Sequence, residues 1–129
     1  MTLTKRQRGI REKLLKIYTT SGIETPITEH VMEGFPTGER AEARQVLESL
    51  ITSGDLILLT PQICLYREDY NRILATAKAH FETNDSLTLA QLRDLLNTSR
   101  KYAQALVEYF DKIHITKKDG DVHYLDQGF

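Results

Sequence analysis

The sequence predicts a mainly α-helical chain with small β wings (α+β), arranged as two winged-helix domains in tandem. Two observations support this prediction. Apolar residues recur at helical spacing in several short segments, and in each half these segments are followed by two strand-like stretches around a turn. We expect the domains to span residues 1–67 and 68–129. Domains of this size lie near the lower limit of independent stability.

Two helices are predicted at the start of the first half. The first covers Lys5–Thr20, whose apolar residues repeat at helical spacing. The second covers Pro26–Met32, because Thr25 precedes a proline that suits the first helical position. Gly34-Phe35-Pro36 then interrupts the chain. The first helix is expected to bury Ile10, Leu14, Ile17 and Tyr18.

A third helix and a hairpin complete the first half. Thr37 is expected to cap this helix and Gly54 to end it, since threonine satisfies free N–H groups and glycine adopts the left-handed conformation. Leu56–Leu59 and Ile63–Tyr66 flank Thr60-Pro61-Gln62 and are predicted to form a wing. The residues of the helix expected to face inward are Ala43, Val46, Leu47, Leu50 and Ile51.

The second half repeats this order. Arg67–Thr83 is predicted to be its first helix, and Leu89, Leu92 and Leu95 indicate a short amphipathic helix over Leu89–Leu96. Asn97-Thr98 ends that helix, and Thr98 or Ser99 is expected to cap the next. The first helix is expected to bury Tyr70, Ile73, Leu74, Ala77 and Phe81, and the last helix Tyr102, Ala103, Leu106, Tyr109, Phe110 and Ile113.

A second wing is predicted at the end of the chain. Ile113–Lys117 and Asp121–Leu125 flank Lys118-Asp119-Gly120, and Asp-Gly between alternating residues is a strong hairpin signal. Asp119-Gly120 is expected to form the turn. Alternation then places Ile113, Ile115, Val122 and Tyr124 on a core face, and His114, Thr116, Lys118, Asp121 and His123 on the opposite face.

Cations gather where the last helix begins. Arg100 and Lys101 lie in its first turn, where the helix dipole disfavours positive charge by about 0.3–1 kcal/mol each. Arg93, Lys117 and Lys118 are expected to converge on the same helix start, whose N–H groups suit a phosphate. Each residue alone is explained by a solvated charged face. Together they favour a phosphate-binding surface.

The residues in this region resemble a known family. Thr98-Ser99-Arg100-Lys101-Tyr102-Ala103 is followed by Leu106, by Glu108-Tyr109-Phe110-Asp111 and by Gly120-Asp121-Val122, and it is preceded by Arg93-Asp94-Leu95-Leu96. This order is similar to the last winged-helix domain of the bacterial selenocysteine-specific elongation factors, SelB. In that family the C-terminal part is a series of winged helices. The last of them binds the selenocysteine insertion hairpin of the messenger RNA and so tethers the factor for UGA recoding.

The resemblance implies a set of RNA-binding residues in this chain. The turn and helix start from Asn97 to Tyr102 correspond to the part that grips the hairpin, together with the tip of the wing. Tyr102 is close enough to the helix start to stack on a base. The expected RNA-binding residues are Arg93, Asn97, Thr98, Ser99, Arg100, Lys101, Tyr102, Lys117, Lys118 and Asp121.

The chain also differs from the full factor. In that family the elongation-factor part carries GTP and selenocysteyl-tRNA, but no G-x-x-x-x-G-K-[ST] phosphate loop occurs in this sequence. We therefore expect a noncatalytic C-terminal part of a longer protein, with no cofactor. His114 and His123 also make this hairpin richer in histidine than is usual in the family.

Composition limits the other function classes. The 129 residues carry a net charge of −1, so a nucleic-acid binder must concentrate its cations locally. The single cysteine, Cys64, cannot form an internal disulfide, and there is no apolar stretch of the roughly 18 residues that a membrane span needs. We expect a cytoplasmic monomer without a membrane anchor.

The sequence contains two other candidate sites. The first helix contains Lys5, Arg6, Arg8, Arg11, Lys13 and Lys16, which form either a solvated face or a contact to RNA, ribosome or a preceding domain. His114 and His123 share one face of the wing, but two imidazoles without a third ligand make a poor zinc site. We expect no metal and no catalytic set of nucleophile and base.

Two alternatives to RNA binding remain open. A DNA-binding transcription regulator would place the Arg100 helix in a major groove and usually bind as a dimer. A winged helix that makes only protein contacts is the other alternative. We expect RNA instead, because the Thr98-Ser99-Arg100-Lys101-Tyr102 match favours it and no dimerisation segment is evident in the sequence. The major groove of RNA is too deep and narrow for a helix to read, so we expect contacts to backbone phosphates and to unstacked loop bases.

Overall fold

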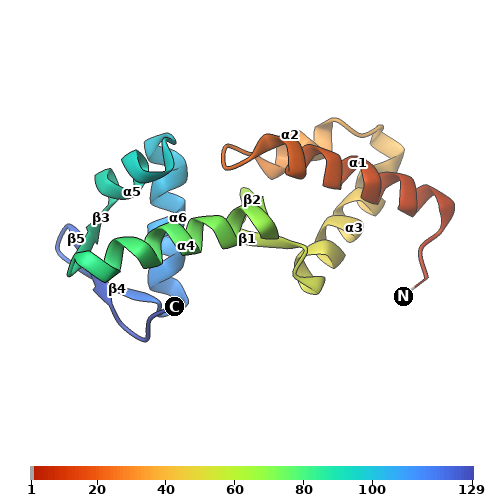
Figure 1. The fold of residues 1–129 in the computed structure, drawn as a ribbon. Helices are drawn as coiled ribbons and strands as arrows, with labels where there is room; N and C mark the ends of the chain where they lie inside the picture. Colours follow the sequence, from red (N-terminus) through yellow and green to blue (C-terminus); the bar gives the residue numbers. More distant parts are fainter. Residues whose placement is uncertain (1) are drawn as a thin grey trace. The chain divides into compact units, whose positions relative to one another are not determined.

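The computed structural model describes residues 2–129, and the chain divides into two compact units at residues 67 and 68. Each unit is a set of three α-helices with a small antiparallel sheet (Figure 1). The first unit contains α1 (Lys5–Ser21), α2 (Thr28–Glu33), the 3-10 turn η1 (Thr37–Glu39), α3 (Arg40–Ser53), β1 (Leu56–Thr60) and β2 (Ile63–Tyr66).

The core of the first unit lies between α1, α3 and the β1–β2 hairpin. Tyr18 and Leu14 of α1 are fully buried, and Leu50 of α3 packs in the same cluster as Leu56 of β1. Ile17 and Ile51 are partly buried against this cluster. α3 ends at Gly54, which adopts φ 86°, as expected for a helix that ends in a left-handed residue. The predicted inward face of the first helix is therefore confirmed at its central positions.

Two predicted helix starts in the first unit are wrong. α2 begins at Thr28 rather than at Pro26, because the Thr25 hydroxyl is buried and donates to the Cys64 carbonyl of β2 at 2.8 Å. Thr37 does not cap α3. Residues 37–39 form the 3-10 turn, and α3 begins only at Arg40, whose guanidinium donates to the carbonyl of Phe35. In both cases a tertiary or local hydrogen bond takes the place of the expected cap.

Cys64 is fully buried in β2, next to the Tyr18 ring of α1. Burial raises the pKa of the Cys64 thiol to about 11 and raises the pKa of the Tyr18 hydroxyl above its usual range. Neither group ionises near neutral pH. The thiolate is the reactive form of cysteine, so the folded protein should protect this side chain.

We expect Cys64 to resist thiol reagents such as Ellman's reagent in the folded state and to react fully in guanidinium chloride. Burial disfavours ionisation of the thiol only in the folded state. The contribution of the neutral thiol to the free energy of unfolding is therefore fully present below its ordinary pKa near 9. It is lost as the pH rises through the folded value of about 11. The absorbance of the released thiolate measures the labelling rate. Rapid labelling of the native protein at pH 8 would contradict the observed burial.

The second unit carries a three-stranded sheet. It contains α4 (Arg67–Thr83), β3 (Ser86–Thr88), α5 (Leu89–Leu96), α6 (Arg100–Lys112), β4 (Thr116–Asp119) and β5 (Val122–Leu125). The strand order is β3-β5-β4, with both pairs antiparallel. The predicted bounds of the first two helices of this unit are confirmed. β3 was not predicted, because a three-residue strand is too short for its alternation to be recognised in the sequence.

Some apolar positions of the second unit are exposed, contrary to prediction. Leu95 is 46% exposed, and Leu92 is the fully buried residue of α5. Ile113 is 40% exposed, since the helical spacing ends there and the chain turns through His114 at φ 65°. Ile115, which follows this turn, is buried, and its N–H donates to the Phe110 carbonyl.

The wing also differs from the prediction in its turn and in the face that it buries. Asp119 pairs with Val122, so the two-residue turn is Gly120-Asp121 and not Asp119-Gly120. Thr116 and His123 are buried, whereas Tyr124 is exposed. Within the two strands the buried residues thus come from the face predicted to be outer, whereas Ile115, just before β4, is buried as predicted. The physical reason is that the inner face of the sheet meets a polar partner on α6, described below.

The prediction of mainly helical, tandem winged-helix domains is confirmed. Each unit has the order of helices and hairpin that defines the class. None of the helices in residues 2–129 combines the length and apolar character required to cross a lipid bilayer.

Candidate nucleic-acid interface

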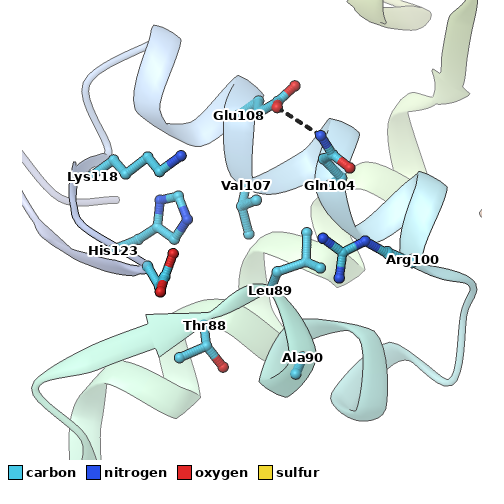
Figure 2. A pocket seen from close by; sticks show the side chains of 10 residues that line it. Thr88, Leu89, Ala90, Arg100, Gln104, Val107, Glu108, Lys118 and His123 are labelled. Atoms are coloured by element: carbon cyan, nitrogen blue, oxygen red, sulfur yellow. Dashed lines mark hydrogen bonds between the residues drawn. The ribbon is translucent and has the colours of Figure 1, made fainter.

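A groove of about 440 Å³ lies between α6, the start of α5 and the wing of the second unit (Figure 2). Arg100 lies at one end of the view and Lys118 at the other. Leu89 and Val107 lie between them and form an apolar floor. The complete lining is Thr88, Leu89, Ala90, Arg100, Gln104, Val107, Glu108, Lys118, Asp121 and His123.

Local capping positions the two helices beside this groove. The Thr88 side chain accepts a hydrogen bond from the Gln91 N–H, and the Gln91 side chain accepts one from the Thr88 N–H, which sets the start of α5. α5 ends at Asn97 in the left-handed conformation, with φ 50°. Ser99 then occupies the N-cap position of α6. The link between Asn97 and Arg100 is only two residues long, so Arg100 lies at the end of the groove, close to the end of α5.

The groove has mixed charge. Arg100 and Lys118 are cationic, whereas Glu108 and Asp121 are anionic. The Gln104 amide donates to the Glu108 carboxylate at 3.1 Å, as the dashed line in Figure 2 marks. Phosphates are repelled by carboxylates, so the two cations suit phosphates at the ends of the groove. The apolar floor and the polar walls suit a base ring and its edges.

A buried hydrogen-bond cluster holds the wing against α6. The Asp111 carboxylate accepts a bond from the Thr116 hydroxyl at 2.7 Å and lies 2.9 Å and 3.0 Å, by its two oxygens, from His123 Nδ1. Thr116 belongs to β4 and His123 to β5. One carboxylate therefore joins α6 to both strands of the wing, which explains why polar residues occupy the buried face of the hairpin.

The structure brings together only part of the predicted binding set. Arg100, Lys118 and Asp121 line the groove. Arg93 lies on α5 and pairs with the neighbouring Asp94 carboxylate at 3.1 Å. Lys117 is adjacent to Lys118 on β4 and so points to the opposite face of the sheet, where it pairs with Tyr124 of β5. Arg93 and Lys117 therefore do not line the groove.

The other predicted residues form the approach to α6. Asn97 is exposed in its left-handed turn, and the Thr98 N–H donates to the Arg93 carbonyl at 3.1 Å. The Lys101 ammonium lies 5.6 Å from the centre of the Tyr102 ring, a favourable cation–π distance. Tyr102 is half-buried. These residues surround the N-terminus of α6 without lining the groove itself.

Seven of the ten lining residues were not predicted to bind RNA, and the four polar ones among them each had some signal in the sequence. Gln104 and Glu108 follow Arg100 at intervals of four residues, so they share one face of the helix. His123 was placed on the same face of the wing as Lys118, but that face was thought to be solvated. At Thr88 the sequence shows only a capping box, in which Thr88 is followed three residues later by Gln91, and this pattern indicates a helix start and not a binding residue.

In the first unit, the cations of α1 are largely engaged by that unit itself. Arg6 lies 3.3 Å from the Glu42 carboxylate and donates to the Gly38 carbonyl. Lys13 donates to the Gly34 carbonyl and lies 4.5 Å from the centre of the Phe35 ring. Arg11 is 3.8 Å from the Asp55 carboxylate. These contacts give the basic helix a structural role.

The two wing histidines do not come together. His114 lies in the turn before β4, 3.9 Å from the Asp126 carboxylate, whereas His123 is buried against Asp111. In the part of the chain that the structure describes, no three His, Cys, Asp or Glu side chains are grouped as metal ligands.

Comparison with known proteins finds sequence similarity to one family of elongation factors. Residues 79–125 match the family model described as elongation factor SelB, winged helix. The selenocysteine-specific elongation factor of Desulfomicrobium baculatum is 28% identical over 122 residues, which cover 94% of this chain and 19% of the relative. The chain thus spans about a fifth of the length of that curated relative.

Two solved structures have a similar fold. The mRNA-binding domain of elongation factor SelB from E. coli, solved in complex with SECIS RNA, has a TM-score of 0.76 and 22% identity, over 96% of this chain and 99% of that one. A bacterial selenocysteine-specific elongation factor, EF-Sec, has a TM-score of 0.70 and 18% identity, over 96% of this chain and 20% of that one.

The fold and the groove define a tandem winged-helix protein with a mixed-charge cleft between its last helix and its wing. The resemblance predicted from residues 93–122 lies within the matched stretch 79–125 and is confirmed. Residues 79–125 are thus similar to the SelB winged helix, and the fold of the chain is similar to that of the mRNA-binding domain of E. coli SelB.

Proposed function

We propose that this chain binds a selenocysteine insertion (SECIS) hairpin in messenger RNA and tethers an elongation factor to it in the cytoplasm. The observation that carries the proposal is the groove of the second unit. All of its lining residues lie within the stretch that matches the SelB winged helix. The E. coli domain of similar fold was solved with SECIS RNA, which further supports this ligand.

In the proposed mechanism, the ends of the groove bind phosphates and its floor binds a base. Arg100 and Lys118 bind backbone phosphates, because both side chains donate hydrogen bonds and carry full charge. An unpaired loop base enters between them and packs on Leu89 and Val107. The RNA nucleotides that flank this base are contacted by the residues around the start of α6 and by the outer lysine of the wing, namely Asn97, Thr98, Ser99, Lys101, Tyr102 and Lys117. Arg93 and Asp121 contribute to the electrostatic potential around those nucleotides.

The family and the groove favour RNA over duplex DNA as the ligand. A DNA-reading helix presents side chains outward to a wide major groove. Here the wing and α5 enclose the exposed face of α6 from Arg100 to Glu108. A cleft of about 440 Å³ accommodates a single unstacked nucleotide better than the edge of a base pair.

A selection experiment tests the proposed function. A library of RNA hairpins with one fixed stem and a randomised loop is selected on the full chain, with the E. coli SECIS hairpin included as a reference. The selected hairpin is then compared by fluorescence anisotropy with three matched ligands: a loop-scrambled hairpin, a hairpin with swapped stem base pairs, and a DNA copy. We expect loop scrambling to weaken binding at least tenfold and stem swaps to have little effect.

The outcome separates this function from its alternatives. Equal affinity for the selected RNA and its DNA copy would favour a DNA-binding regulator. A library from which no loop sequence is enriched would reject sequence-specific RNA recognition. The expected result is that particular loop bases are enriched and that binding is lost when the loop is scrambled.

A further inference from the structure

The Asp111 cluster has a chemical consequence for the groove. An ionised carboxylate only accepts hydrogen bonds, so the atom of His123 that faces it must carry a hydrogen. That atom is Nδ1, which lies within 3.0 Å of both Asp111 oxygens. In the neutral imidazole the second nitrogen, Nε2, is then an acceptor. Asp111 thereby determines which tautomer His123 adopts.

His123 is also held in a fixed position. Its side chain is only 6% exposed, and it pairs across the wing with Lys118. The Thr116 hydroxyl, on the same face of the hairpin, donates to the same carboxylate. The ring therefore has little freedom to rotate. Figure 2 shows it in the groove, between Lys118 and the apolar floor.

The neighbouring groups make this nitrogen distinctive. Arg100 and Lys118 only donate hydrogen bonds. The Glu108 carboxylate is engaged by the Gln104 amide, and Asp121 is exposed at the wing turn. A neutral Nε2 is thus a fixed acceptor beside the floor on which a base would pack. It rejects phosphate oxygens, which are acceptors themselves, and selects groups that donate.

Building on the proposed RNA function, we propose that His123 is a specificity-determining residue and that Asp111 is its positioning residue. Nε2 of His123 accepts a hydrogen bond from a donor group of an unpaired nucleotide. The donor is an N–H group on the base edge or the ribose 2′-hydroxyl, and the experiment distinguishes the two. Asp111 acts through the imidazole, by keeping its hydrogen on Nδ1.

Two matched variants test the role of His123 in the full chain. His123→Asn keeps an amide nitrogen near the position of Nδ1, which can donate to Asp111, and removes Nε2. His123→Gln restores a polar atom near the position of Nε2. Both are measured with the selected hairpin and with versions in which one loop nucleotide lacks one donor. These analogues are inosine for guanosine, purine riboside for adenosine, and 2′-deoxynucleotides.

We expect one analogue to weaken binding by the wild-type chain about tenfold and to leave binding by His123→Asn unchanged, because that variant has already lost the contact. A base analogue with this effect identifies an N–H donor, and a 2′-deoxynucleotide identifies the ribose. His123→Gln should recover part of the sensitivity. Equal losses for wild type and His123→Asn at every loop position would overturn the role of His123.

A spectroscopic measurement tests Asp111 independently of binding. The nitrogen chemical shifts of the His123 ring at about pH 8 should report the tautomer with hydrogen on Nδ1 in the wild-type chain. Asp111→Asn can donate from its amide, so it should release that preference and reduce discrimination among the analogues. Hydrogen on Nε2 in the wild-type protein would overturn the proposal, even if the variants do not fold.

The two proposals fail in different ways. Equal binding of the selected and loop-scrambled hairpins by the wild-type chain would reject the RNA function, and the role of His123 with it. Retained loop discrimination, combined with equal analogue losses in wild type and His123→Asn, would reject the role of His123 alone. Circular dichroism of each variant shows that a loss of binding is not a loss of fold.

Discussion

Replacing Arg100 and Lys118 together by alanine is expected to weaken hairpin binding by roughly 30- to 150-fold, or about 2–3 kcal/mol. The two cations lie at opposite ends of the groove, so each contacts a different phosphate. Removing them should also flatten the plot of log affinity against log salt by somewhat less than two units. Titrations at several salt concentrations measure both effects.

The fold should tolerate this double substitution. Arg100 begins α6, where the helix dipole disfavours a cation, so its loss should leave the free energy of unfolding unchanged or raise it by up to about 1 kcal/mol. The matched control is Lys78→Ala with Lys112→Ala, two exposed lysines of the same unit outside the groove. Equal losses of affinity in the two double variants would show that only net charge matters.

Phe110→Ala is expected to destabilise the second unit by about 3–5 kcal/mol. Phe110 is fully buried on the inner side of α6, and its ring makes an edge contact with Phe129, with the ring centres 6.3 Å apart. Removing the ring leaves a cavity beneath the helix that carries Arg100. The wing also depends on this position, because the Ile115 N–H donates to the Phe110 carbonyl. Denaturant unfolding followed by circular dichroism measures the change.

Phe81→Ala is the matched control for this prediction. Phe81 contacts the same Phe129 ring, at 6.1 Å between centres, but it is only half-buried on α4. The same atoms are removed from a less enclosed site, so the loss of stability should be clearly smaller. Similar losses in the two variants would mean that the environment of Phe110 is no more tightly packed than that of Phe81.

Features that depend on neighbouring residues were predicted well from the sequence. The bounds Arg67–Thr83 and Leu89–Leu96 agree with the structure, because apolar spacing and capping residues act within one or two helical turns. The cationic start of α6 was also visible, since Arg100 and Lys101 stand where stability alone favours acidic residues. These local signals were sufficient to identify the fold class and the family resemblance.

The candidate site was predicted only in part. Arg100, Lys118 and Asp121 come together, because the start of α6 and the wing line the same groove. Lys117 does not join them, since successive residues of a strand point to opposite faces. Gln104 and Glu108 were missed because their role depends on what the facing wing and α5 enclose.

The sequence by itself determined the presence of each α-helix, the order of the two units and the cationic start of α6, since each follows from residue spacing along a continuous segment. Only the tertiary structure decided which face of the last wing is buried. Asp111 satisfies the hydrogen bonds of Thr116 and His123, and β3 pairs Leu87 with His123 on the sheet. Alternation defines two faces of a hairpin, but the partners that cover one of them come from distant parts of the chain.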